Sequence, residues 1–101
     1  ELMKPSAYLI NTARGGLVNE TDLLHSLTTE QIAGAALDVL HEEPPRNGNL
    51  ILQHKSANLI VTPHMAWASK QSRQRLLDQL AGNISNFFQG KPFNQVGDSL
   101  G

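Results

Sequence analysis

The sequence predicts an α/β fold built on a small parallel β-sheet. Three short apolar runs, residues 7–10, 32–40 and 59–61, are separated by segments of helical or loop character. The runs are continuous rather than alternating, apart from one acid in the second, which suits strands that are covered on both faces. Strands that alternate with helices favour a parallel sheet with right-handed crossovers.

The first run is predicted to lead through a tight turn into a helix. Residues 11–16 (Asn-Thr-Ala-Arg-Gly-Gly) are a polar turn with paired glycines. Asn19 can accept hydrogen bonds from the first N–H groups of the helix that follows. Thr28-Thr29 weakens this helix where it ends. Its apolar face would consist of Leu23, Leu24 and Leu27.

The second run is predicted to be a strand, with a helix as the alternative. Small residues at 33–36 would let a helix approach the sheet closely, although alanine also favours helix itself. Gly34 and the length of the run favour the strand. Asp38 interrupts the run, and an acid in apolar surroundings needs a partner. Pro44-Pro45 ends the segment, because neither structure continues through two prolines.

The third run is predicted to be a short strand that precedes a long helix. Before it, residues 50–52 (Leu-Ile-Leu) should form a single helical turn packed on the sheet. The run itself stops at Thr62-Pro63. From Ser69, large apolar residues recur at helical spacing over about five turns. Gly90 fits the C′ position of this helix, and residues 93–101 are expected to be a loose tail.

The composition excludes several classes of protein. The formal net charge is −1 and the basic residues are scattered, so no nucleic-acid partner is expected. No apolar run approaches the roughly 18–20 residues of a membrane span, so no membrane partner is expected. The absence of cysteine excludes disulfides and thiolate chemistry and favours a cytoplasmic location. No pair of histidines or carboxylates has metal-ligand spacing on one helical face, so no metal site is expected.

Each predicted strand is followed by a polar residue whose side chain could take part in binding or catalysis: Arg14, Glu43 and His64. The carboxyl ends of parallel strands lie along one edge of a sheet, and ligands bind in the crevice there. Arg14 can hold a carboxylate in a bidentate fork, and His64 can transfer a proton near neutral pH. Glu43 can orient the imidazole and favour its protonated form. The set predicts proton transfer beside an anionic substrate.

Each of these residues also has a structural interpretation. Arg14 could be a solvated loop cation, Glu43 a turn acid, and Asp38 a residue paired with a nearby backbone group. Glu42 competes with Glu43 for the acid role on spacing alone. The joint placement at three strand ends favours the functional interpretation. The other histidines are expected to be surface residues: His25, His41 and His54.

Three segments make the chain resemble the C-terminal part of the D-isomer-specific 2-hydroxyacid dehydrogenases. They are residues 9–20 (LINTARGGLVNE), 34–45 (GAALDVLHEEPP) and 62–69 (TPHMAWAS), and their order and separations also match. The Ala66-Trp67 pair and the Glu-Pro-Pro ending are most similar to the branch of glycerate dehydrogenases and hydroxypyruvate (glyoxylate) reductases.

The resemblance implies a role for each strand-end residue. Arg14 would bind the substrate carboxylate and polarise the keto oxygen. His64 would act as acid when hydroxypyruvate or glyoxylate is reduced and as base in the reverse direction, with Glu43 rather than Glu42 as its partner. Asp38 would face the nicotinamide carboxamide. The residues implied in cofactor binding are Thr12, Ala13, Arg14, Asp38, His64 and Ala66.

The resemblance also implies that the chain is a C-terminal fragment of a longer enzyme. Residues 1–68 would be the C-terminal half of the NAD(P)-binding domain, the second half of a Rossmann-like sheet. Residues 69–101 would be the long return helix and tail that lead toward an absent substrate domain. The G-x-G-x-x-G motif, which lies upstream in the family, is absent from the chain. The fragment alone is therefore expected to be inactive and to leave an apolar edge and face of its sheet uncovered.

The full-length protein implied by the resemblance is an oxidoreductase. It would reduce the 2-ketoacid to the D-2-hydroxyacid by hydride transfer from NAD(P)H, with NADPH favoured by analogy to the branch, and it would be a homodimer. The alternative is a non-enzymatic, corepressor-like relative of the same fold that senses dinucleotides.

Overall fold

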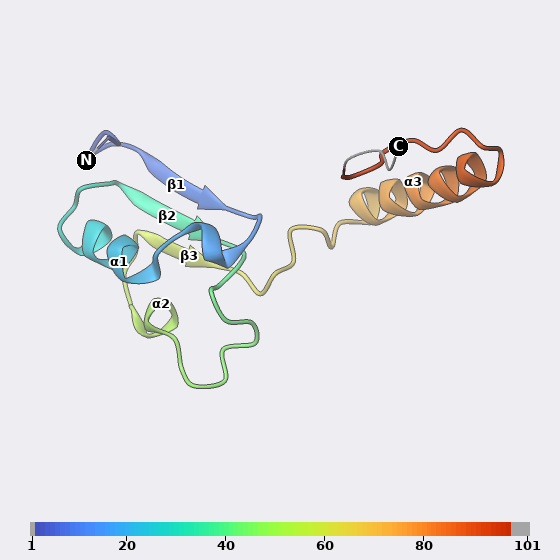
Figure 1. Cartoon of the computed structure of the whole chain (residues 1–101). Helices are drawn as coiled ribbons and strands as arrows, with labels where there is room; N and C mark the ends of the chain where they lie inside the picture. The colour runs from blue at the N-terminus through green and yellow to red at the C-terminus, as the bar shows by residue number, and fades with distance from the viewer. Residues whose placement is uncertain (1, 98–101) are drawn as a thin grey trace. The chain divides into compact units, whose positions relative to one another are not determined.

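A computed structural model describes residues 2–97 of the chain (Figure 1). The chain forms two compact units, one up to Ala66 and the other from Trp67 onward. Each unit is described by itself below. Within the described residues, every helix is too short or too polar to cross a membrane.

The first unit contains a three-stranded parallel sheet in the order β1-β2-β3 (Figure 1). The strands are β1 (Tyr8–Asn11), β2 (Gly34–Leu37) and β3 (Leu59–Val61). All three predicted strands are present, with β1 displaced by one residue and β2 shorter than the apolar run. The helical alternative for the second run is wrong. An added Cβ at Gly34 would lie 2.8 Å from the Asn58 carbonyl oxygen, so the central strand needs a small residue there.

Two helices and a short 3₁₀ turn complete the first unit. The 3₁₀ turn η1 (Gly15–Leu17) follows β1 and precedes α1 (Glu20–Thr28). The Asn19 side-chain oxygen accepts hydrogen bonds from two backbone N–H groups of α1 at 3.0 and 3.2 Å, which confirms the predicted cap. The predicted single turn is α2 (Leu50–Gln53), and Ile51 in it is 1% exposed.

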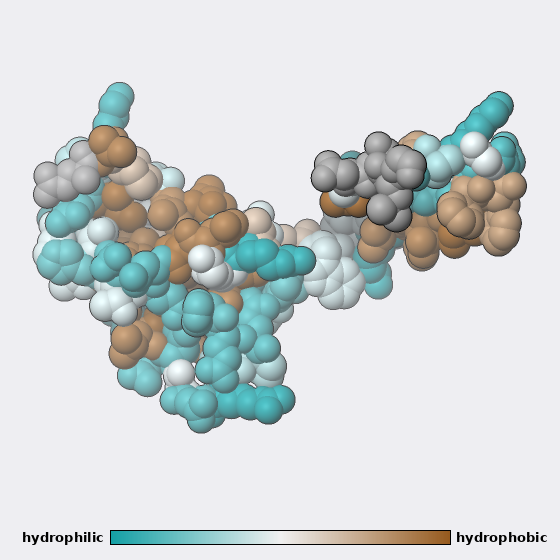
Figure 2. Space-filling model, viewed as in Figure 1, coloured by the Kyte–Doolittle hydropathy of each residue, from teal (hydrophilic) through white to brown (hydrophobic). Residues whose placement is uncertain are grey.

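The core of the first unit lies between one face of the sheet and the two helices. Its buried residues are Leu23, Leu27, Ile32, Ala35, Leu37, Leu40 and Ile51. On the opposite face of the sheet, Tyr8, Ile10 and Ile60 are 70%, 71% and 63% exposed. Brown, hydrophobic surface is accordingly visible on this unit in Figure 2. The expectation of an uncovered apolar sheet face is therefore confirmed for this chain.

The second unit is dominated by α3 (Lys70–Phe88), the predicted long helix. The Ser69 hydroxyl caps it by accepting a hydrogen bond from the Ser72 N–H at 3.1 Å. Its large apolar residues are exposed: Leu76, Leu77, Leu80, Ile84, Phe87 and Phe88.

The end of α3 has the hydrogen bonds of a Schellman motif. Gly90 has a φ of 69°, and its N–H donates to the Phe87 carbonyl, while the Lys91 N–H donates to the Asn86 carbonyl. The predicted loose tail is only partly correct. The Asn94 amide donates to the Asn83 side chain at 3.2 Å, so the tail folds back on the helix at this point. Residues 98–101 of that prediction lie outside the described residues.

Candidate active site

The turn after β1 is held by the side chain of Asn11. This residue is 7% exposed. Its side-chain oxygen accepts a hydrogen bond from the Ala13 N–H at 3.1 Å, and its amide donates to the Arg14 carbonyl at 2.9 Å. The Arg14 guanidinium is exposed and donates to the Ala13 carbonyl at 2.8 Å. An asparagine at a strand end is typical of a turn, because its side chain can form hydrogen bonds with the backbone two or three residues later. The role of Asn11 in holding the Arg14 backbone was not predicted.

The Asp38 carboxylate accepts hydrogen bonds from the segment that follows β3, residues 62–66. Its Oδ1 accepts hydrogen bonds from the Thr62 hydroxyl at 2.5 Å and from the Met65 N–H at 2.9 Å. Its Oδ2 accepts from the Ala66 N–H at 2.8 Å. The Asp38 carboxylate is buried, so these donors compensate its loss of water. The interpretation of Asp38 as a residue paired with nearby backbone is therefore what the structure shows.

His64 lies within this segment and has an unusual backbone conformation. Its φ is 49°, in the left-handed region that residues with a Cβ seldom occupy. Its N–H donates to the Asp38 carbonyl at 2.8 Å and to the Thr62 carbonyl at 3.0 Å. Strained backbone of this kind persists where the surroundings determine it and is concentrated at functional sites.

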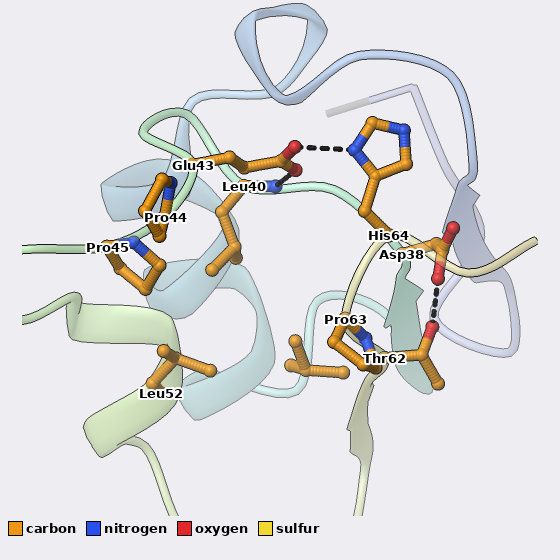
Figure 3. Close-up of a pocket in the computed structure, with 10 residues that line it drawn as sticks. Asp38, Leu40, Glu43, Pro44, Pro45, Leu52, Thr62, Pro63 and His64 are labelled. Atoms are coloured by element: carbon orange, nitrogen blue, oxygen red, sulfur yellow. Dashed lines mark hydrogen bonds and ion pairs between the residues drawn. The ribbon is translucent and has the colours of Figure 1, made fainter.

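The His64 ring contacts the carboxylate of Glu43, not that of Glu42. Nδ1 lies 2.6 Å from Oε2 of Glu43 (Figure 3). The other carboxylate oxygen accepts a hydrogen bond from the Leu40 N–H at 2.7 Å. The imidazole is 44% exposed and the Glu43 side chain 32% exposed, so the pair is open to a substrate.

Hydrogen bonds keep both acids of the site ionised. The Thr62 hydroxyl and then the Met65 N–H hold the pKa of Asp38 below its ordinary value. The Leu40 N–H, followed by the His64 ring, lowers the pKa of Glu43. An ionised carboxylate only accepts hydrogen bonds. Nδ1 of His64 therefore carries the proton in its bond to Glu43.

A cavity of about 410 Å³ lies beside the pair (Figure 3). Apart from the acids, His64 and Thr62, its lining is apolar: Leu40, Pro44, Pro45, Leu52, Val61 and Pro63. Arg14 is not part of this lining. The cavity therefore gives the carboxylate–imidazole pair one apolar flank and does not itself supply a cation for an anionic substrate.

Gly15 brings the turn after β1 against the Leu40–His41 peptide. A Cβ added at Gly15 would lie 1.9 Å from the Leu40 carbonyl oxygen and 2.5 Å from the His41 nitrogen. Only glycine allows the two backbones to approach this closely. Sequence reasoning identified the paired glycines only as turn residues, because nothing in the sequence identifies the backbone that Gly15 faces.

The structure thus joins three of the predicted site residues in one network: Asp38, Glu43 and His64. The Ala66 N–H belongs to this network through Asp38, while Thr12 and Ala13 lie exposed in the turn that holds Arg14. The parallel sheet places all of these residues after the carboxyl ends of their strands. One expectation is wrong: His54, which follows α2, is half-buried rather than on the surface.

Comparison with known proteins identifies relatives of this chain. Residues 1–66 match the family model of the D-isomer specific 2-hydroxyacid dehydrogenase, NAD binding domain. A glycerate dehydrogenase of Methylorubrum extorquens is 55% identical over 93% of the chain. A hydroxypyruvate reductase of Blautia hydrogenotrophica is 42% identical, also over 93% of the chain. The chain spans 30% and 29% of the length of these two relatives.

Solved structures agree with this assignment. An acyclic imino acid reductase in complex with NADPH and D-Arg superimposes with a TM-score of 0.79 at 38% identity, covering 95% of the chain and 30% of that protein. An NADPH-dependent glyoxylate/hydroxypyruvate reductase of Sinorhizobium meliloti gives a TM-score of 0.70 at 31% identity, covering 92% of the chain and 28% of that protein. These similarities confirm the Rossmann-like parallel sheet. The chain belongs to the D-isomer specific 2-hydroxyacid dehydrogenase family, and residues 1–66 correspond to its NAD-binding domain.

Proposed function

We propose that this chain supplies the acid–base pair and the substrate anchor of an NADPH-dependent 2-ketoacid reductase that acts on hydroxypyruvate or glyoxylate. The observation that carries the proposal is the 2.6 Å contact between Nδ1 of His64 and the Glu43 carboxylate at the carboxyl edge of the sheet. The names of the relatives from Methylorubrum, Blautia and Sinorhizobium support this substrate class.

The residues present fit a nicotinamide cofactor. A carboxylate has about four acceptor positions, and the bonds to Asp38 from Thr62, Met65 and Ala66 use three of them. One position on Oδ2 of Asp38 remains for an N–H donor such as a carboxamide. Thr12 and Ala13 would pass their backbone beside the nicotinamide ribose. The bound nicotinamide would supply the hydride for the substrate carbon.

The side chains of this chain would handle the charge and the proton. Arg14 would bind the substrate carboxylate through two parallel N–H bonds and polarise the keto oxygen. With Nδ1 bound to Glu43, the proton for the keto oxygen would come from Nε2 of His64, which leaves the imidazole neutral and the product as the D-2-hydroxyacid. Glu43 would hold the ring in position and stabilise its charged form before transfer.

The test is a cofactor and substrate panel on the full-length protein. NADPH and NADH oxidation is followed by absorbance with hydroxypyruvate, glyoxylate and pyruvate, each with and without an added amine. We expect rapid oxidation of NADPH with hydroxypyruvate or glyoxylate alone. A rate that requires the amine would assign the protein to imine reduction and contradict the ketoacid proposal. Residues 1–101 by themselves should give no measurable rate, because the pyrophosphate-binding motif is not among them.

A further inference from the structure

The carboxylate of Glu20 ties down both ends of the loop that carries Glu43. Oε1 of Glu20 accepts a hydrogen bond from the His41 N–H at 2.8 Å. Oε2 accepts from the Asn49 side-chain amide at 2.7 Å. His41 and Asn49 are the first and last residues of this loop, which we call the acid loop (residues 41–49). One side chain at the start of α1 therefore closes the acid loop at two points.

The acid loop has little packing of its own to fix its position. Seven of its nine residues are exposed, and only Pro45 and Asn49 are partly buried. Its two prolines have no N–H to donate. Segments with few buried contacts open locally at low cost in free energy. The hydrogen bonds at the ends of the acid loop thus carry much of its positional restraint.

Leu40 connects the restraint at His41 to the Glu43–His64 pair. The peptide that Glu20 binds joins Leu40 to His41, and the Leu40 N–H donates to Oε1 of Glu43 at 2.7 Å. Gly15 packs against the same peptide, because a Cβ there would clash with the Leu40 carbonyl. The Leu40–His41 peptide is therefore held by a hydrogen bond to Glu20 and by close packing on Gly15.

We propose that Glu20 is a positioning residue for the Glu43–His64 pair. It makes no contact with the pair itself; it fixes the acid loop so that the Glu43 carboxylate meets Nδ1 of His64. This inference rests on the proposed function for its kinetic consequence. Its structural consequence, the integrity of the Glu43–His64 hydrogen bond, can be measured without any substrate.

The test uses Glu20→Gln in the full-length protein, with Asp22→Asn as the matched control. Both substitutions remove one negative charge from the first turn of α1. Of these two carboxylates, however, it is that of Glu20 that accepts hydrogen bonds from the acid loop. In Glu20→Gln the amide group faces the Asn49 amide, so that two donors oppose each other. Changing Asn49→Asp as well restores a donor–acceptor pair, and the new carboxylate can still accept from the Ile51 N–H that caps α2.

We expect Glu20→Gln to lower kcat for hydroxypyruvate about tenfold while KM changes less than about twofold. This is below the roughly hundredfold that a misplacement of about 1 Å can cost. The NMR resonance of the His64 Nδ1 proton should be lost or broadened in Glu20→Gln, retained in Asp22→Asn, and recovered in the double variant with Asn49→Asp. In a Glu43→Gln background, Glu20→Gln should have no further effect on kcat, since it acts through Glu43.

Three results would overturn the inference. The first is an unchanged kcat and Nδ1 resonance in Glu20→Gln, and the second is an equal loss in Asp22→Asn. The third is a kcat loss of the same size when Glu43 is already glutamine. If the wild-type protein reduces none of the ketoacids, the proposed function fails, and the Nδ1 resonance alone then decides the role of Glu20.

Discussion

Gly15→Ala should uncouple the turn that holds Arg14 from Leu40, whose N–H holds Glu43. The added Cβ would start 1.9 Å from the Leu40 carbonyl oxygen, whereas ordinary contact begins at 3.4 Å, so the two backbones must separate by about 1.5 Å. Displacing catalytic groups by about 1 Å can cost roughly a hundredfold in rate. We therefore expect kcat of the full-length protein for hydroxypyruvate to fall by about a hundredfold.

The same substitution should also lower the free energy of unfolding. Inserting a methyl group where no room exists typically costs about 1–3 kcal/mol. Replacing glycine restricts the unfolded chain and returns about 0.4–1 kcal/mol. The steric cost is larger, so a net loss of about 1–2 kcal/mol should be seen in urea unfolding. The φ of Gly15 is not in the left-handed region, so the loss of stability would come from the steric clash and not from an unfavourable backbone conformation.

The neighbouring glycine provides the control. A Cβ at Gly16 has nothing within 4 Å and its φ is not left-handed, so Gly16→Ala should leave kcat unchanged and stability unchanged or slightly higher. Equal effects of the two substitutions would show that general sensitivity of the turn, and not the contact with Leu40, is responsible. A Gly15→Ala variant with wild-type kcat would refute the reasoning.

Three further predictions concern the same unit. Asp38→Asn should lower kcat about tenfold. The amide NH₂ would face the N–H of Met65 or Ala66, so the segment that carries His64 would lose a hydrogen bond and shift. Unaltered kinetics would contradict this. Since the pKa of Asp38 and of Glu43 is lowered on folding, the stability they contribute is present above about pH 4.5 and is lost as pH falls below about 4. The urea midpoint of Glu43→Gln should therefore depend less steeply on pH in that range than that of the wild type, and equal slopes would argue against the shift. Asn19→Ala should cost about 1 kcal/mol in urea unfolding through loss of the α1 cap, and an unchanged urea midpoint would contradict this.

The fold could be predicted from the sequence because each element carries its own local signal. The apolar runs specified the strands, Asn19 and Ser69 marked the starts of the two longer helices, and Gly90 marked the end of α3. The helical alternative for residues 32–40 was wrong, and the predicted loose tail was only partly correct. Alanine-rich composition did not distinguish the two states there, and the close approach of Gly34 to its neighbouring backbone decided for the strand.

The candidate site could be predicted only as far as side-chain chemistry and topology reach. Strand order placed Arg14, Glu43 and His64 at one edge, and the structure pairs the last two. What supports them was not predictable, because it consists of contacts between backbone and distant residues. The N–H groups that bind Asp38, the packing of Gly15 on Leu40, and the hydrogen bonds of Glu20 to the acid loop leave no periodic or local pattern in the sequence.

The central claim is that His64 donates the proton to the substrate, and His64→Gln tests it most directly. A positioned general acid contributes about 10²–10⁴-fold to rate. The steady-state kcat for NADPH-dependent hydroxypyruvate reduction by full-length His64→Gln should therefore fall at least about a hundredfold, with the protein still folded by circular dichroism. A folded variant that keeps kcat within about threefold of the wild type would contradict the account.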